Sequence, residues 1–176
     1  MKIIKRGTRY DNVNKQYFRE IICEDENLSF KELIEKNKLI LKDADLKNMD
    51  FSGFDLSGAD FSDSDLENAN FSDSNLENAN FESAYLNNAN FSRAKMNHAN
   101  LKYAKGSHVN FSATKLISAD LSFSRFHSAN LYYADFEKAS LFSAWFNYSN
   151  LNRTFLKKTD LRCVNFDSTT WKDVTF

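Results

Sequence analysis

The sequence predicts an all-β solenoid, because a large apolar residue recurs every five positions through most of the chain. The series begins at Leu41, Leu46, Phe51, Leu56 and continues to Phe176. A helix buries residues at a spacing near 3.6 and a strand at a spacing near 2, so a period of five fits neither pattern. We therefore expect a short unit that stacks on copies of itself.

Each unit contains a small residue, then Asp or Asn, then Leu or Phe, then two variable residues, as in residues 69–73 (Ala-Asn-Phe-Ser-Asp). The small and bulky positions suit a narrow interior, and the variable positions can face water. This pattern resembles the pentapeptide repeat family over residues 39–176, about four fifths of the chain. The resemblance implies a right-handed quadrilateral β-helix in which four units complete one square coil.

The 138 residues from 39 to 176 make about seven coils of 20 residues, and at about 4.8 Å per coil the rod is about 33 Å long. Residues 20 apart should then lie above one another. One interior column is Phe51, Phe71, Phe91, Phe111, Leu131, Leu151 and Trp171. The next is Leu46, Leu66, Leu86, Gly106, Phe126, Phe146 and Phe166.

Three residues break the repeat. Gly106 removes one core side chain, so we expect Phe126 to lean into the space or the backbone to bulge there. Met49 and Phe54 replace small residues in the first coil. This substitution indicates that the first coil is widened by something packed beside it.

The leader, residues 1–38, is expected to cover the open first coil as a cap. Ser29 and Glu32 have the spacing of a capping box, which predicts a short helix from about Phe30 to Asn37. Farther upstream, an apolar group fits a helical stripe or a buried strand equally well. Its members are Tyr17, Phe18, Ile21 and Ile22.

An asparagine column should link the coils, because stacked amides can hydrogen-bond along a ladder. It comprises Asn70, Asn90, Asn110, Asn130 and Asn150, with Asp50 below them. We interpret this ladder as structural.

Composition points to no particular partner, because the net charge is only −1. No apolar run has the length of a signal peptide or a membrane span, and the chain has no proline, so we expect one domain in the cytoplasm. Cys23 and Cys163 are expected to be reduced thiols.

No pattern for catalysis, cofactor binding or metal binding is present in the sequence, and we expect a protein that is not an enzyme. His98 and His108 are half a coil apart, and His127 belongs to another column, so the three should not share a metal.

The charged residues form a gradient along the repeats. Residues 41–90 carry a balance of −9 and residues 91–176 a balance of +6. This gradient either keeps the rod soluble or steers a partner. The candidate acidic surface comprises Asp45, Asp50, Asp55, Asp60, Asp63, Asp65, Glu67, Asp73 and Glu77.

Aromatic residues at variable positions concentrate in the later coils and indicate a partner interface, unless the leader covers them. With one arginine, this candidate patch comprises Tyr103, Phe123, Arg125, Tyr132, Tyr133, Phe142, Trp145, Tyr148 and Phe155. The last coil leaves Phe166, Trp171 and Phe176 at an open end, which predicts a homodimer through the C-terminal coil.

These features favour a non-enzymatic scaffold that binds a protein partner. The family resemblance also implies an alternative, a DNA-mimicking binder of DNA gyrase or another type II topoisomerase that inhibits the enzyme or protects it from quinolones or toxins. A second alternative is nucleic-acid binding by the basic half. The residues that could serve it are Lys95, Lys105, Lys115, Arg125, Lys157, Lys158 and Arg162.

Overall fold

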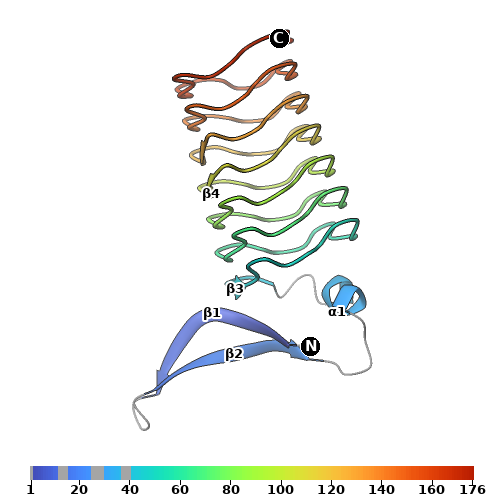
Figure 1. Ribbon diagram of the computed structural model, residues 1–176, viewed down its shortest axis with the longest axis vertical. Coiled ribbons are helices and arrows are strands. Elements are labelled where there is room, and N and C mark those ends of the chain that lie inside the picture. The colour runs from blue at the N-terminus through green and yellow to red at the C-terminus, as the bar shows by residue number, and fades with distance from the viewer. Residues whose placement is uncertain (1, 12–15, 25–29, 37–40) are drawn as a thin grey trace.

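The chain forms a right-handed quadrilateral β-helix with a β-hairpin and a short helix at its N-terminal end (Figure 1). The computed structural model describes residues 2–11, 16–24, 30–36 and 41–176. Within these ranges, no helix combines the length and the apolar character of a membrane span.

Parallel bridges between residues 20 apart define the coil. Asp45 pairs with Asp65 and Asp50 with Asn70, and the same offset recurs every five residues up to the pairing of Phe155 with Thr175. The predicted 20-residue columns are therefore confirmed.

The backbone hydrogen bonds show why the repeat has five residues. Asn70 donates its N–H to the Met49 carbonyl of the coil below (2.9 Å), and Phe71 donates to the Asn90 carbonyl of the coil above (2.7 Å). Ala69 N–H closes a turn on the Leu66 carbonyl (3.0 Å). Asn68 also donates its N–H to the Asn87 carbonyl of the coil above (2.8 Å), so three N–H groups of each unit bond to neighbouring coils and one closes the turn.

The second variable residue of the units adopts a left-handed conformation, which the sequence analysis did not anticipate. The φ angle is 58° at Asn68, 58° at Tyr103 and 62° at Phe123. Glycine occupies this position only at Gly53 and Gly58 among the described residues with positive φ. Non-glycine residues accept this less favourable conformation because the ladder on both sides fixes the turn.

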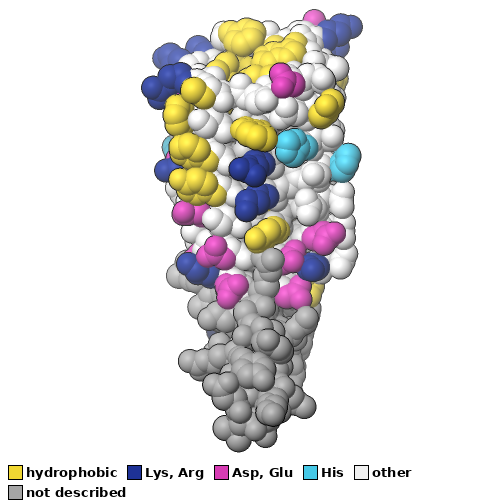
Figure 2. Space-filling model, turned by 90° about the vertical axis from the view of Figure 1, so that its left-hand side faces the viewer, with side chains coloured by type: hydrophobic (Ala, Val, Ile, Leu, Met, Phe, Trp, Pro, Cys, Tyr) yellow, Lys and Arg dark blue, Asp and Glu magenta, His cyan; other side chains and the backbone are white. Residues whose placement is uncertain are grey.

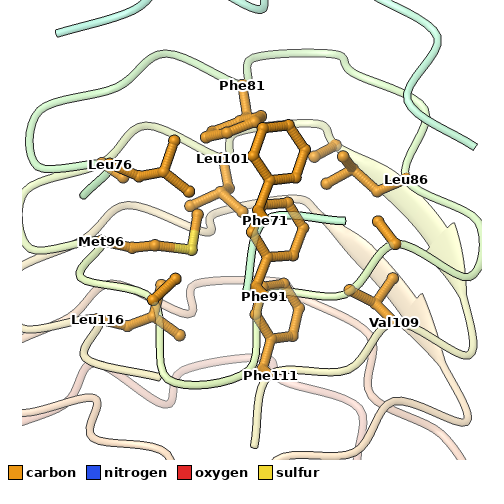
Figure 3. Close-up of a cluster of buried hydrophobic side chains, with 14 of the residues drawn as sticks. Phe71, Leu76, Phe81, Leu86, Phe91, Met96, Leu101, Val109, Phe111 and Leu116 are labelled. Carbon is orange, nitrogen blue, oxygen red and sulfur yellow. The ribbon is translucent and has the colours of Figure 1, made fainter. Parts of the chain in front are cut away.

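The interior is filled by stacked rings, as the columns predicted (Figure 3). The ring centroids of Phe71 and Phe91 lie 4.9 Å apart with 2° between the ring planes. Those of Phe91 and Phe111 lie 5.3 Å apart with 12° between the planes. Phe81 meets Phe91 edge-on at 5.5 Å. Trp171 was placed in this interior column, but it is 38% exposed.

The asparagine ladder is confirmed. The Nδ2 of Asn70 donates to Asp50 Oδ1 (3.0 Å), and Asn90 and Asn110 repeat the bond to the coil below at 3.0 Å each. The ladder extends through Asn130 and Asn150, where the bonds lengthen to 3.2 and 3.4 Å. These carboxamides tie successive coils together at their surface.

Val109 packs into the gap at Gly106, and Phe126, which we expected to lean into it, meets Phe111 edge-on at 5.2 Å. A Cβ atom at Gly106 would lie 2.6 Å from Val109 Cγ2 and 2.9 Å from the Leu86 carbonyl oxygen. Figure 3 shows Leu86 and Val109 on the same side of the phenylalanine column. The backbone here is an extended strand, β4 (Lys105–Ser107), paired in parallel with β5 (Arg125–His127).

The leader contains two strands, β1 (Lys2–Asp11) and β2 (Gln16–Glu24), followed by helix α1 (Phe30–Lys36). β1 pairs antiparallel with β2 and with β3 (Ala44–Asp45), which gives the sheet order β2-β1-β3. The apolar group from Tyr17 to Ile22 therefore belongs to a strand. Of the capping box, Ser29 lies outside the described residues.

Helix α1 contacts the first coil where Phe54 breaks the repeat. Lys31 places its Nζ 5.3 Å from the centre of the Phe54 ring and donates to the Gly53 carbonyl (3.3 Å). Glu35 Oε1 accepts the Asp55 N–H at 2.9 Å. The buried side chain of Ile34 joins the same apolar core.

Candidate functional site

The exposed aromatic residues of the later coils form two separate groups. The first, which we call the Tyr103 cluster, comprises Tyr103, Phe123, Phe142 and Arg162 from consecutive coils. The ring centroids of Tyr103 and Phe123 lie 5.2 Å apart with 10° between the ring planes, and Phe142 meets Phe123 edge-on at 5.4 Å. The Arg162 guanidinium lies 5.4 Å from the Phe142 ring.

The second group, the Tyr133 cluster, comprises Tyr132, Tyr133, Arg153 and Phe155. Arg153 Nη1 donates to the hydroxyl oxygens of Tyr132 and Tyr133, both at 3.2 Å. Its guanidinium also lies 5.5 Å from the Tyr133 ring. The hydrogen bond to Tyr133, with the nearby Tyr132 and Asp173, raises the pKa of Arg153.

These two clusters lie on opposite sides of the rod. Phe123 and Tyr133 are ten residues apart, which is half of the 20-residue coil that the bridges define. The predicted single patch is therefore wrong as one continuous surface. Tyr148, which is 68% exposed, belongs to neither cluster. Apart from the half-buried Phe142, the rings of both groups remain exposed, so cover by the leader is also wrong.

A third arrangement, the Lys105 column, comprises Tyr85, Lys105, Arg125 and Trp145 at one bridging position of four successive coils. Lys105 Nζ lies 5.7 Å from the Tyr85 ring centre, and the Arg125 guanidinium lies 5.1 Å from that of Trp145. In sequence, Lys105 follows Tyr103 by two residues, and Arg125 follows Phe123 by two residues. The intervening residues, Ala104 and Ser124, are buried, so the column and the cluster share one side of the rod.

The acidic residues of the early coils surround the rod instead of forming one face. Asp45, Asp50, Asp55 and Asp60 occupy four successive bridging positions of the same coil. Asp65 repeats the position of Asp45 one coil later. The other members of the predicted set, at variable positions of different columns, are Asp63, Glu67, Asp73 and Glu77.

Several of these carboxylates are already used by the fold. Asp55 Oδ1 accepts hydrogen bonds from Asn75 Nδ2 and Ser57 N–H, both at 3.1 Å. Hydrogen bonds from Ser52 lower the pKa of Asp50. A bidentate contact with Arg93, at 2.7 Å for both bonds, lowers the pKa of Asp73.

The contact of Asp160 with Arg162, a member of the Tyr103 cluster, allows the effect of an arginine on a carboxyl pKa to be tested. The Arg162 guanidinium donates two hydrogen bonds to Asp160, at 2.9 and 2.7 Å, and the Arg162 backbone N–H donates a third at 3.2 Å. Together they lower the pKa of that carboxyl from 3.8 to about 2. Because folding lowers the pKa of Asp160, the contact stabilises the folded state fully at pH values above about 3.8. This stabilisation is lost as the pH falls from about 3.8 towards 2.

Arg162→Gln should therefore raise the pKa of Asp160 towards 3.8, while the backbone N–H of residue 162 continues to lower it. NMR titration of the carboxyl carbon measures this change, with Asp73 as the internal reference. An Asp160 pKa that stays near 2 in the variant would show that the Arg162 guanidinium is not the cause.

The open C-terminal end retains its predicted aromatic residues. Phe166 packs edge-on against Trp171 at 4.7 Å, and Trp171 stacks near Phe176 at 6.2 Å. Phe176 is 72% exposed. These rings form an apolar surface at the tip of the rod.

His98 lies half a coil from His108, whereas His108 donates its backbone N–H to the His127 carbonyl of the coil above at 2.9 Å. His127 lies beside Trp145, at 6.2 Å between ring centres. Over the described part of the chain, no three His, Cys, Asp or Glu side chains are placed to hold a metal ion.

Sequence reasoning missed Tyr85 and Arg153 as members of the aromatic surfaces. Both could have been found by aligning residues 20 apart, since Tyr85 falls below Lys105 and Arg153 above Tyr133. Grouping the aromatic residues by their position along the sequence, instead of by column, also merged two sides of the rod into one patch.

A family model described as pentapeptide repeats matches residues 40–78, 74–105 and 107–141, with eight copies. None of the curated proteins matches the chain.

Solved structures give only weak similarities. A trypsin-treated variant of QnrB1, described as a plasmid-mediated fluoroquinolone resistance protein, is 21% identical, with 73% of this chain and 72% of that chain covered and a TM-score of 0.38. HetL from Nostoc sp. strain PCC 7120, involved in heterocyst differentiation regulation, is 20% identical, with 74% and 88% covered and a TM-score of 0.25. Rfr23 from Cyanothece 51142 is 29% identical, with 61% and 63% covered and a TM-score of 0.26.

Proposed function

The chain belongs to the pentapeptide repeat family, and from that premise we propose that it is a non-enzymatic scaffold whose flat faces bind a protein partner. The observation that carries this proposal is the Tyr103 cluster with its neighbouring Lys105 column. Together they place large aromatic side chains and cations on one side of a rigid rod. Aromatic and arginine side chains of this kind are enriched at protein interfaces.

The rod supports such a surface because its backbone does not need to move on binding. Each coil is bonded to the next through backbone bridges and the asparagine ladder. Neighbouring exposed rings also hold one another in place, as in the stack of Tyr103 on Phe123. A preorganised surface loses little conformational entropy when it binds a partner.

Affinity capture with matched variants tests the scaffold function. Wild-type protein should retain a specific protein from a lysate of its own source, and the double variant Tyr103→Ser, Phe123→Ser should lose it. The double variant Tyr133→Ser, Phe155→Ser changes the opposite side and is the control. If no retained protein distinguishes the first variant from the wild type, the scaffold proposal fails.

Topoisomerase binding is the alternative that the family resemblance implies. The acidic early coils and the rod shape favour it, and QnrB1 is described as a fluoroquinolone resistance protein. Mimicry of DNA requires a continuous acidic surface, whereas these carboxylates surround the rod and several bind the fold itself. A gyrase supercoiling assay with and without a quinolone should show inhibition or protection at low micromolar protein if this alternative holds.

Nucleic-acid binding by the basic half has less support in the geometry. Lys95 and Lys115 share one column, half a coil away from Lys105 and Arg125, so these four cations do not form one basic stripe. Salt-dependent retention on DNA would be the expected behaviour if this second alternative held.

We further propose that two copies associate through the C-terminal coil. Trp171 and Phe176 expose apolar surface there, and Phe166 lies beneath them. Sedimentation equilibrium at micromolar concentrations should detect a dimer for the wild type and a monomer for the double variant Trp171→Ser, Phe176→Ser. A wild type that is monomeric throughout this range would remove the proposal.

We also propose that the chain divides into an N-terminal cap and a β-helix. Residues 1–38 act as a leader and cap, and residues 39–176 form the β-helix of about seven coils. The pairing of β1 with β3 and the contacts of Lys31 and Glu35 with the first coil support the assignment of a cap.

A further inference from the structure

The Lys105 column contains two like charges side by side. Lys105 and Arg125 are register partners of the parallel strands β4 and β5. Like charges at paired positions of neighbouring strands repel one another. Among residues 31–36 and 41–176, neither side chain forms an ion pair with a carboxylate, so the fold itself does not neutralise them.

Aromatic rings hold these two cations from both ends. Tyr85 contacts Lys105 from the coil below, and Trp145 contacts Arg125 from the coil above. Beside them, the rings of the Tyr103 cluster add apolar surface. Figure 2 shows hydrophobic and basic side chains gathered over the later coils, with acidic side chains nearer the N-terminal end.

The opposite column provides an internal comparison. Lys95 and Lys115 are also register partners, but Asp135 follows Lys115 at the next bridging position. No ring lies over either lysine among the described residues. The two pairs of cations therefore carry the same charge but have different surroundings.

We propose that the Lys105 column and the Tyr103 cluster together bind an acidic, apolar segment of a partner protein, with a carboxylate between Lys105 and Arg125. This inference rests on the proposed scaffold function and names the chemistry of the partner. The unneutralised cation pair provides the charge complementarity. Apolar side chains of the segment would contact Trp145 and the Tyr103 cluster.

The geometry favours a protein segment over a nucleic acid. Bases stack on the faces of aromatic rings, but Tyr103 and Phe123 stack face to face on one another. The other cations nearby, Arg162 and Lys102, are already paired, with Asp160 at 2.7 Å and with Asp120 at 3.2 Å. A phosphate backbone needs a longer row of free cations than this side offers.

The test uses full-length protein and a short fluorescein-labelled peptide in which aspartate and leucine alternate. The double variant Lys105→Ser, Arg125→Ser should weaken binding roughly tenfold or more. The control Lys95→Ser, Lys115→Ser removes the same charge from the opposite side and should change binding by less than about twofold. Circular dichroism confirms that both variants keep the wild-type fold.

Trp145 reports the contact directly. In a Trp171→Phe background it is the remaining tryptophan, and its emission should shift when the acidic peptide is added. A single-stranded DNA oligonucleotide and a peptide in which lysine and leucine alternate serve as the competing probes. Both should bind more weakly than the acidic peptide.

Three outcomes would overturn the inference. Equal weakening by the two double variants would show a response to overall charge. Tighter binding of the oligonucleotide would assign the side to nucleic acid. Absence of binding to the acidic peptide would reject the stated chemistry, whereas the scaffold function is decided separately by the capture experiment.

Discussion

Replacement of Phe91 by alanine should lower the free energy of unfolding by about 3–5 kcal/mol. Phe91 is fully buried in the middle of the interior column. Its ring stacks on Phe71 and Phe111 and meets Phe81 edge-on, so its removal leaves a cavity that rigid neighbouring coils cannot collapse to fill. Urea unfolding followed by circular dichroism measures the change.

The control is Phe155→Ala, because Phe155 has the same ring on the outer surface. This change should cost about 1 kcal/mol or less. Since each coil contacts only its neighbours, Phe91→Ala should also weaken protection from hydrogen exchange most strongly in residues 71–111. Equal losses for the two variants would contradict a core supported by the phenylalanine column.

Replacement of Gly106 by leucine should cost about 3 kcal/mol, although it restores the repeat pattern. The new Cβ atom would lie 2.6 Å from Val109 Cγ2, and the rest of the side chain would need the space that Val109 occupies. Val109→Ala alone should cost about 2 kcal/mol, because it empties the same space. Both free energies of unfolding can be measured by urea titration.

The double variant Gly106→Leu, Val109→Ala tests whether these residues exchange volume. It recreates the combination found one coil below, where Leu86 is followed by Ala89. It should be more stable than Gly106→Leu alone, by about 1–3 kcal/mol. It should stay below the wild type, because the Leu86 carbonyl oxygen remains 2.9 Å from the new Cβ atom. Costs that simply add would show that the two positions are independent.

Much of the fold could be predicted because the repeat is local and strict. Once the coil was taken as 20 residues, the column of Phe71, Phe91 and Phe111 and the ladder of Asn70, Asn90 and Asn110 followed from numbering alone. The leader has no such repeat, so a strand and a helix remained equally possible around Tyr17. The long-range pairing of β1 with β2 and β3 decides the outcome there.

The candidate site was only partly predictable for a different reason. The sequence placed Tyr103, Phe123, Tyr133 and Phe155 outside, because their positions in the unit are variable. Whether they share one side depends on their angle around the rod, and half a coil separates Phe123 from Tyr133. The actual partners, such as Arg153 with Tyr133, lie one coil apart and about 20 residues away in sequence.

The sequence by itself determined a repeating solenoid and the outward position of its variable residues, because a period of five fits neither a helix nor a strand. The interior columns followed once the family resemblance implied a coil of 20 residues. The tertiary structure decided which outer side chains meet. It separated the aromatic residues into two clusters, brought Arg153 to Tyr132 and Tyr133, and filled the space above Leu86 with Val109. These contacts form across coils, where side-chain direction and the left-handed turn matter more than the order of residues along the chain.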